Sequence, residues 1–212
     1  MYLFEDISMK VICIYSTNYR SNTFFACSDG HCAIIDPGAE TGDVVAAVDK
    51  NGLIPDLILL THGHFDHIFS LDSLREHFSV PVYIHAEDAE LLTSSEKNAY
   101  SLFWNGSFTQ GAADKTFIGG DRIAVGSEFL DVIHTPGHTN GSSCFACGDI
   151  LITGDTLFAD SFGRTDLYGG DSSALFKSLS AMRNLKCSAE TKIYPGHGGS
   201  TLLSYALDNV IY

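Results

Sequence analysis

The sequence is short of basic residues. Its 212 residues include 12 lysines and arginines against 26 aspartates and glutamates, which gives a formal net charge of −14 and an isoelectric point near 4.8. Proteins that bind nucleic acids carry clustered Lys and Arg to neutralise phosphates. This charge balance therefore argues against DNA or RNA as a substrate or partner.

Long hydrophobic runs are also missing. The longest, around Leu57–Leu60, has the length of a strand and is far too short to span a membrane. The first residues, Met1 to Asp6, lack the basic start and apolar stretch of a secretory signal peptide. We therefore expect a protein that has no membrane partner and resides in the cytoplasm.

Cysteine is present, but its arrangement does not suggest a disulfide framework. Cys144 and Cys147 form a C-x-x-C motif, which could indicate redox chemistry or a metal pair. The segment 142–147 alternates like a strand, however, and residues three apart on a strand point to opposite faces. Buried thiols are the favoured interpretation for the six cysteines, which are scattered through apolar runs: Cys13, Cys27, Cys32, Cys144, Cys147 and Cys187.

The composition favours one folded domain with a full core. Hydrophobic residues make up 45% of the chain, charged residues 18%, and the mean hydropathy is +0.09. No linker, low-complexity segment or clear repeat divides the sequence. We expect a single domain over residues 1–212.

Hydrophobic periodicity predicts alternating strands and helices. Short apolar runs bounded by turn residues predict strands over 10–16, 23–27, 31–35, 56–60, 81–85, 122–125, 128–134, 142–147, 150–153 and 191–194. Helical spacing or helix-end signals predict helices over 41–52, 71–78, 172–185 and 201–210. The first three strands form an expected antiparallel meander. An α+β fold, an αββα sandwich of two mixed β-sheets with helices on the outer faces, accommodates this order.

The stretch from Thr93 to Gly120 has no clear periodicity. It contains Phe103, Trp104 and Phe108 together with several Gly and Ser residues. Two interpretations stay open for it: a partly helical loop near a pocket, or an ordinary surface excursion.

The most informative motif follows the strand that ends at Leu60, and it reads Thr61-His62-Gly63-His64-Phe65-Asp66-His67. Imidazole nitrogens and carboxylate oxygens are ligands for zinc, iron and manganese, and a catalytic site leaves a position for water. Alternate residues of an extended chain point the same way, so His62 and His64 can bind one ion. If a helix begins next, its first turn would direct Asp66 and His67 towards a second ion.

Three further candidate ligands lie downstream, at His138, Asp155 and His197. Each follows an apolar run that ends in Gly, and together with the first motif they make seven candidate metal ligands. The dipeptides Pro136-Gly137 and Pro195-Gly196 suit a tight turn that places a ligand at a strand end. The remaining histidines are isolated in sequence and are interpreted as ordinary surface or core residues: His31, His77, His85 and His134.

The order of these motifs resembles a known family. After H-x-H-x-D-H come Thr135-Pro136-Gly137-His138-Thr139, then Thr153-Gly154-Asp155-Thr156-Leu157-Phe158, then Tyr194-Pro195-Gly196-His197-Gly198. This series is similar to the metallo-β-lactamase-fold hydrolases and covers almost the whole chain. Within them, Gly163-Arg164-Thr165-Asp166 followed by Gly169-Gly170-Asp171 resembles the short, bacterial glyoxalase II-like branch.

The resemblance implies a dinuclear metal site. It assigns His62, His64 and His138 to one ion, and Asp66, His67 and His197 to the other, with Asp155 bridging them. The cofactors it implies are two divalent ions, zinc before iron or manganese, which share a water of lowered pKa and polarise a carbonyl. It makes Asp66 and Asp155 the catalytic residues, and Arg164 and Tyr168 candidate substrate contacts.

The implied function is hydrolysis of a small thioester, such as an S-acylglutathione. The chain departs from full-length glyoxalase II enzymes, because only fifteen residues follow His197 where those enzymes have a helical C-terminal region that helps to hold glutathione. Its acidic charge also disfavours an anionic thiol conjugate unless cations such as Arg164 or Lys115 compensate. Arg164 could equally be an ion-pair partner of Asp166 or Asp171.

Two other classes of function remain open. A persulfide dioxygenase of the same fold would use one iron held by His62, His138 and Asp155. A non-catalytic metal-binding module is the third interpretation, although none of the seven ligands is missing. Lactones and β-lactams are open to the same hydrolytic chemistry, and the sequence leaves the oligomeric state undetermined.

Overall fold

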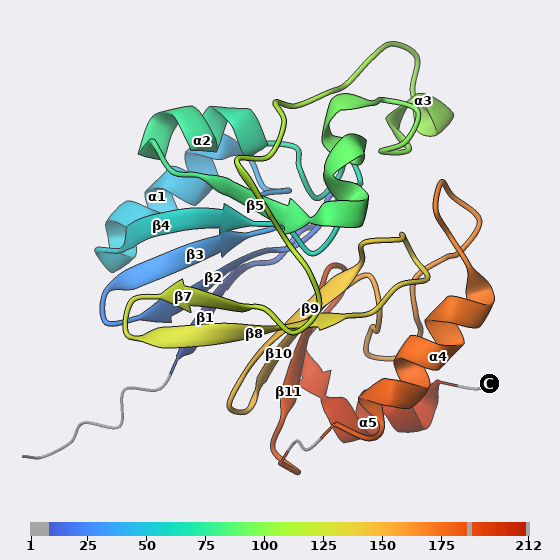
Figure 1. Cartoon of the computed structure of the whole chain (residues 1–212). Coiled ribbons are helices and arrows are strands. Elements are labelled where there is room, and N and C mark those ends of the chain that lie inside the picture. Colours follow the sequence, from blue (N-terminus) through green and yellow to red (C-terminus); the bar gives the residue numbers. More distant parts are fainter. Residues whose placement is uncertain (1–8, 186–187, 211–212) are drawn as a thin grey trace, which may run out of the picture.

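Two six-stranded sheets form the centre of the fold (Figure 1). The computed structural model describes residues 9–185 and 188–210. Sheet A contains, in spatial order, β1 (Lys10–Ile14), β2 (Thr23–Ser28), β3 (His31–Ile35), β4 (Ile54–Leu59), β5 (Val82–His85) and β6 (Lys115–Phe117). Sheet B contains, in spatial order, β12 (Thr201–Leu202), β11 (Lys192–Pro195), β10 (Ile150–Gly154), β9 (Ser143–Cys147), β8 (Glu128–His134) and β7 (Arg122–Val125).

Both sheets are mixed, as predicted. In sheet A, β1, β2 and β3 form the expected antiparallel meander, and β3 to β6 pair in parallel. In sheet B, β7 to β10 are antiparallel neighbours, β10 and β11 are parallel, and β12 returns antiparallel. The parallel pairs matter for function, because the carboxyl ends of parallel strands meet at one edge of a sheet.

Helices cover the outer face of each sheet, which confirms the αββα sandwich. The helical segments are α1 (Thr41–Asn51), α2 (Leu71–Phe78), the 3₁₀ helix η1 (Ala86–Thr93), α3 (Tyr100–Phe103), α4 (Ser172–Met182) and α5 (Leu203–Asn209). In Figure 1, α1 and α2 lie over sheet A, and α4 and α5 lie on the far side of sheet B. Among the described residues, no helix is long and apolar enough to cross a membrane.

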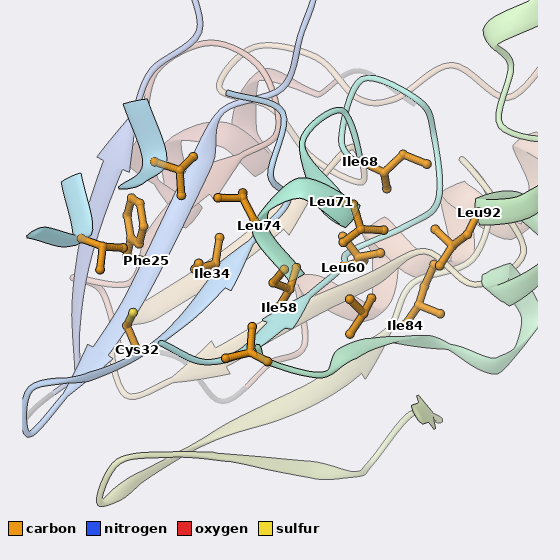
Figure 2. Packing of buried hydrophobic residues seen from close by; sticks show 14 of the residues in the cluster. Phe25, Cys32, Ile34, Ile58, Leu60, Ile68, Leu71, Leu74, Ile84 and Leu92 are labelled. Carbon is orange, nitrogen blue, oxygen red and sulfur yellow. The ribbon is translucent and has the colours of Figure 1, made fainter. Parts of the chain in front are cut away.

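The alternation of side chains along the strands explains the three apolar layers. On β3, Cys32 and Ile34 face α1 and α2, whereas Ala33 and Ile35 face sheet B. Figure 2 shows the outer cluster of sheet A, in which Leu71 and Leu74 of α2 meet strand residues. Because every second residue points to the opposite face, a strand with both faces covered is apolar throughout.

The third apolar layer lies between sheet B and its helices. The two cysteines of the C-x-x-C motif lie on opposite faces of this sheet. Cys144 packs with Leu175 of α4 in this layer, whereas Cys147 packs against the layer between the sheets. The prediction of opposite faces is therefore confirmed. The described cysteines are all free thiols, and Cys187 lies outside the described residues.

Some elements differ from the sequence-based prediction. The stretch 93–120 is partly helical, as one interpretation held, but it also contains the edge strand β6. The 3₁₀ helix η1 was not predicted. Asp171 caps the start of α4, where its carboxylate accepts a hydrogen bond from the Ala174 amide. The final segment divides into β12 and α5.

Candidate metal centre

The candidate ligands gather at one edge of the sandwich, where strands of both sheets end. The His62–His67 motif follows β4, His138 follows β8, Asp155 follows β10 and His197 follows β11. Strands β10 and β11 are parallel, and their last register pair is Gly154 with Pro195. This pairing brings Asp155 and His197 to the same edge.

His62, His64 and His138 form one close group, in which the ligand nitrogens lie within 4.8 Å of one another. Nδ1 of His64 lies 2.9 Å from Nε2 of His138. All three side chains are almost completely buried. The structure thus brings together the three residues that the resemblance assigned to one ion.

Hydrogen bonds orient two of these imidazoles. Nδ1 of His138 donates to the carbonyl of Arg164 at 2.7 Å, which leaves Nε2 unprotonated, with its lone pair facing Nδ1 of His64. Thr61 Oγ1 donates to Asp36 at 2.6 Å and therefore accepts from Nδ1 of His62 at 3.1 Å. Each ring then presents the nitrogen that a metal ion needs.

Asp66, His67 and His197 form the second group, again with ligand atoms within 4.8 Å. Oδ2 of Asp66 lies 3.1 Å from Nε2 of His197. A hydrogen-bonded turn, in which the His67 amide donates to the His64 carbonyl, places the first two residues. The conditional expectation of a helix directly after the motif is wrong, because α2 begins only at Leu71.

Asp155 lies between the two groups. Its Oδ1 is 3.2 Å from Nε2 of His67, and its Oδ2 is 3.6 Å from Nε2 of both His138 and His197. One carboxylate therefore reaches ligand atoms of both triads, as a bridging residue must.

Buried atoms without hydrogen bonds test whether the site suits metal ions. Within the described residues, Nε2 of His62, Nε2 of His67 and Oδ1 of Asp155 are buried and make no hydrogen bond. A buried polar atom without a partner costs about 1–3 kcal/mol, so several together indicate a ligand. Nitrogen and carboxylate donors in two triads with a shared carboxylate fit two divalent ions.

The two triads differ in their affinity for protons. Burial lowers the pKa of His62 well below its usual value, and the neighbouring imidazoles lower it further. Burial and His138 likewise lower the pKa of His64 to about 3. Burial opposes the charged form of His67 as well, but the carboxylates of Asp155, Asp66 and Asp36 outweigh it and raise its pKa well above the usual value.

The same opposition acts on His197 and Asp155. Burial disfavours the imidazolium of His197, but the hydrogen bond with Asp66 prevails and raises its pKa. Burial disfavours the Asp155 carboxylate, yet the charge of His67 holds its pKa well below the usual range. His67 and His197 of the second triad therefore bind protons more tightly than His62 and His64 of the first.

Asp36 is a supporting residue that the sequence analysis missed. Its fully buried carboxylate accepts hydrogen bonds from Nδ1 of His67 at 2.9 Å and from the amide and hydroxyl of Thr61. A carboxylate behind a histidine ligand fixes the orientation of the ring. A signal existed, since Asp36 directly follows the apolar strand 31–35, a strand-end position like those of the predicted ligands.

Asp88 is a second missed residue, and it joins two ligand loops. Its fully buried carboxylate accepts from the amides of Gly63 and Gly141 and from the hydroxyl of Thr139. Gly63 lies between the first two histidine ligands, and Thr139 follows His138. Asp88 sits inside η1, which the sequence did not predict, so no sequence signal pointed to it.

The turns that carry the ligands need glycine, as expected. A Cβ on Gly196 would lie 2.2 Å from Oδ1 of Asp155, and one on Gly137 would lie 2.3 Å from the Leu175 amide nitrogen. Gly137 also has a φ of +138°. A side chain at either position would displace a ligand.

A cavity of about 380 Å³ opens over the metal centre. Its lining includes ligands from both triads, Asp155, and the aromatic residues Tyr19, Phe65, Phe103, Trp104 and Phe158. The interpretation of 93–120 as a segment near a pocket is therefore confirmed. The volume lies within the range of small-molecule sites.

The two candidate substrate contacts are placed differently. Arg164 lines the cavity, but its guanidinium makes two hydrogen bonds to the Asp166 carboxylate, at 2.6 and 2.8 Å. Tyr168 is not among the lining residues, and its hydroxyl donates to Glu90 at 2.8 Å.

The four histidines left out of the site stay outside the two triads. His31 pairs with Asp56, and His77 belongs to no ligand group among the described residues. His85 and His134 form a further group with Glu87, away from the cavity lining. In that group Nδ1 of His85 accepts from the Glu87 amide and Nε2 of His134 lies 2.8 Å from the Asn140 carbonyl.

Comparison with known proteins places these residues in context. Residues 17–197 match the family model described as the metallo-beta-lactamase superfamily. The probable metallo-hydrolase YqgX of Bacillus subtilis is 36% identical over 184 residues, covering 86% of this chain and 87% of YqgX. Hydroxyacylglutathione hydrolase GloC of Haemophilus influenzae is 29% identical over 199 residues, covering 92% of this chain and 93% of GloC.

Solved structures share the fold. BLEG-1, titled a B3 metallo-beta-lactamase, superimposes with a TM-score of 0.86 at 32% identity, covering 94% of this chain and 97% of BLEG-1. TTHA1623, in a di-iron-bound form, superimposes with a TM-score of 0.81 at 33% identity, covering 92% of this chain and 96% of TTHA1623.

Proposed function

Because this chain belongs to the metallo-beta-lactamase superfamily, we propose that its metal centre hydrolyses small thioesters. The superfamily of metallo-hydrolases and the clustered His and Asp side chains support hydrolysis in general. The choice of a thioester as the substrate is the more specific part of the proposal. We further propose that the centre binds two divalent metal ions and that these are zinc.

One observation carries the proposal: Asp155, which lines a cavity of small-molecule size, contacts ligands of both predicted triads. When bound there, two divalent ions would supply a shared water of lowered pKa and polarise the substrate carbonyl. This chemistry requires no serine or cysteine nucleophile from the protein.

The side chains of the protein have distinct parts in the proposed reaction. His62, His64 and His138 would hold one ion, and Asp66, His67 and His197 would hold the other. Asp155, whose carboxylate contacts both triads, would be shared between the two sites. Asp66 lines the cavity, where its carboxylate can accept a hydrogen bond from the attacking water and direct it to the carbonyl.

The comparisons support the thioester and also define the competing substrates. GloC, which is similar to this chain over most of its length, is named a hydroxyacylglutathione hydrolase, and a hydroxyacylglutathione is a thioester. BLEG-1 is titled a beta-lactamase, so a β-lactam belongs in the test. The di-iron form of TTHA1623 makes iron the alternative metal, because the same imidazole and carboxylate ligands accept zinc, iron or manganese.

A paired measurement tests the proposal. Protein purified without added metal is analysed for zinc, iron and manganese, and the same sample is assayed for S-lactoylglutathione and S-acetyl-N-acetylcysteamine hydrolysis, β-lactam hydrolysis and persulfide-dependent oxygen uptake. We expect two metal ions per chain and turnover of at least one thioester, with no oxygen uptake.

Other outcomes replace the proposal with a stated alternative. One iron per chain with oxygen uptake identifies a persulfide dioxygenase that uses His62, His138 and Asp155. β-Lactam turnover without thioester turnover moves the substrate to lactams. Stoichiometric metal without any turnover favours a non-catalytic module. We also propose that the partner is a small molecule, with no nucleic acid or membrane, and that the protein acts in the cytoplasm.

A further inference from the structure

The wall of the cavity above the metal centre is aromatic. Five aromatic residues from four separate segments of the chain line it: Tyr19, Phe65, Phe103, Trp104 and Phe158. The first four contact one another, with centroids 4.9 Å apart for Tyr19 and Trp104 and also for Phe65 and Trp104. Residues from three distant segments therefore build one apolar surface.

Much of this surface faces solvent. Tyr19 and Phe103 are each about half exposed, at 51% and 50%, and Trp104 is 38% exposed. Aromatic rings gathered at the surface of a monomer indicate a binding site, because their exposure to water is unfavourable. Phe65 ties this surface to the chemistry, since it lies between His64 and Asp66 in the metal-binding motif.

Away from the metal centre, the side chains that line the cavity offer little positive charge. Among the described residues that line it, Arg164 is the one arginine or lysine, and Asp166 already binds its guanidinium. Two cations nearby are also paired: Arg20 contacts Glu40 at 2.6 Å, and Lys97 contacts Glu90 at 2.5 Å. The net charge of −14 adds a general repulsion of anions.

We propose that this cavity selects thioesters that carry an uncharged aromatic substituent and discriminates against glutathione conjugates. The proposal rests on thioester hydrolysis at the metal centre, as proposed above, and names the substrate class. The aromatic substituent packs against Phe103 and Trp104 while the thioester carbonyl reaches the ligands at the cavity floor. The carboxylates of glutathione find no unpaired arginine or lysine in the described lining.

Trp104 provides a direct binding signal, because it is the single tryptophan of the chain and lines the cavity. The probes are thioethers, which have no carbonyl to hydrolyse: S-benzyl-N-acetylcysteamine, S-methyl-N-acetylcysteamine and S-benzylglutathione. The first two differ in the aromatic group, and the first and third differ in the charged carrier. Titrations use the full chain, with and without added zinc.

We expect the benzyl cysteamine probe to bind at least about tenfold more tightly than each of the other two, as judged by tryptophan fluorescence. The Phe103→Ala variant should weaken its binding about fivefold and leave the methyl probe unchanged. Tyr205→Ala is the matched control, since Tyr205 is exposed on α5 and outside the cavity lining. Equal binding of the benzyl and methyl probes, or tighter binding of S-benzylglutathione, overturns the proposal.

A second variant tests the role of charge in the opposite direction. Asp166→Ala removes the carboxylate that binds Arg164, so the guanidinium becomes available to an anionic ligand. S-benzylglutathione should then bind several times more tightly, with no change for the benzyl cysteamine probe. If the glutathione probe is unaffected, Arg164 is not what limits anion binding, and the charge argument is wrong.

Turnover separates this proposal from the one on which it rests. Metal-loaded protein is assayed with S-phenylacetyl-N-acetylcysteamine, S-acetyl-N-acetylcysteamine and S-lactoylglutathione, and we expect kcat/KM to be highest for the first. Turnover of S-lactoylglutathione at equal or higher kcat/KM overturns the aromatic selectivity alone. No turnover of any thioester, with metal bound, overturns the proposed function.

Discussion

The two halves of the metal centre are built differently. The triad of His62, His64 and His138 contains only imidazoles and is almost completely buried. The triad of Asp66, His67 and His197 contains a carboxylate, and the His197 side chain is 34% exposed. One half thus consists of buried imidazoles, and the other includes a carboxylate and a partly exposed imidazole.

The difference follows from the neighbours of each triad. Burial lowers the pKa values of His62 and His64, and the neighbouring imidazoles lower them further. Burial also opposes the charged forms of His67 and His197, but nearby carboxylates outweigh it and raise their pKa values. Protons therefore compete with a metal ion more strongly at His67 and His197 than at His62 and His64.

The largest effects on metal binding and activity are expected when single ligands are removed. Asp155→Asn should lower metal binding at both triads, because its carboxylate contacts both, whereas His62→Ala and His197→Ala should each remove one ion. Each variant should lower kcat/KM by about a thousandfold or more, the upper range for electrostatic and acid–base groups. Metal analysis and circular dichroism on the same samples check the stoichiometry and the fold. Unaltered activity in His62→Ala or Asp155→Asn would overturn the site assignment.

Asp88 should affect the all-histidine triad selectively. Its carboxylate accepts hydrogen bonds from three groups beside His62, His64 and His138. An amide has one acceptor oxygen, so Asp88→Asn leaves an N–H facing another donor. We expect metal affinity at this triad to fall about 10–100-fold, as for other groups that support ligands. The exposed Asp131→Asn is the control, and calorimetry measures both. Equal loss at the second triad would contradict a local role.

The pH dependence of metal affinity should distinguish the two triads. The raised pKa values of His67 and His197 mean that protons compete more strongly with a metal ion for these two side chains, so metal affinity at the second triad falls as pH falls. The His62→Ala variant keeps the second triad. For each proton that the metal ion displaces there, we expect the metal affinity to drop about tenfold per unit decrease in pH. The His197→Ala variant, which keeps the first triad, should show a weaker pH dependence, because burial and neighbouring imidazoles lower the pKa values of His62 and His64. Calorimetry in buffers of different ionisation enthalpy counts the protons released when the metal binds. Equal proton release by the two variants would contradict the difference between the triads.

The smallest effect is expected at Tyr168. Its hydroxyl donates to the exposed Glu90, and Tyr168 is not among the residues that line the cavity. Exposed interactions of this kind contribute little, about 0–1 kcal/mol. Tyr168→Phe should therefore change KM less than about twofold in steady-state assays. A tenfold rise in KM would restore Tyr168 as a substrate contact.

Much of the fold and of the centre could be predicted because the signals are local. Alternating apolar runs predicted the strands, and the spacing of His62 and His64 predicted that both could reach one ion. Asp36 carried a similar strand-end signal but lacked a histidine neighbour to draw attention to it. Asp88 could not be predicted, because its function depends on contacts with Gly63, Thr139 and Gly141, which lie far away along the chain.

The short turn after His64 is a clear case where local pattern was insufficient. Asp66 and His67 were expected at the start of a helix, but that helix begins at Leu71. Buried hydrogen bonds decide the turn instead: the Ser21 amide donates to the Asp66 carbonyl, and His67 donates to Asp36. Both partners come from the N-terminal meander, which no local pattern around the motif reveals.

By itself, the sequence determined which side chains could bind metal and which strand ends would carry them, because ligand chemistry and strand periodicity are properties of neighbouring residues. Only the tertiary structure decided that Asp155 lies between the two triads, that their protonation differs, and that aromatic residues from five positions surround the cavity. These features arise from distances between segments far apart in the chain, and electrostatic and packing energies depend on those distances.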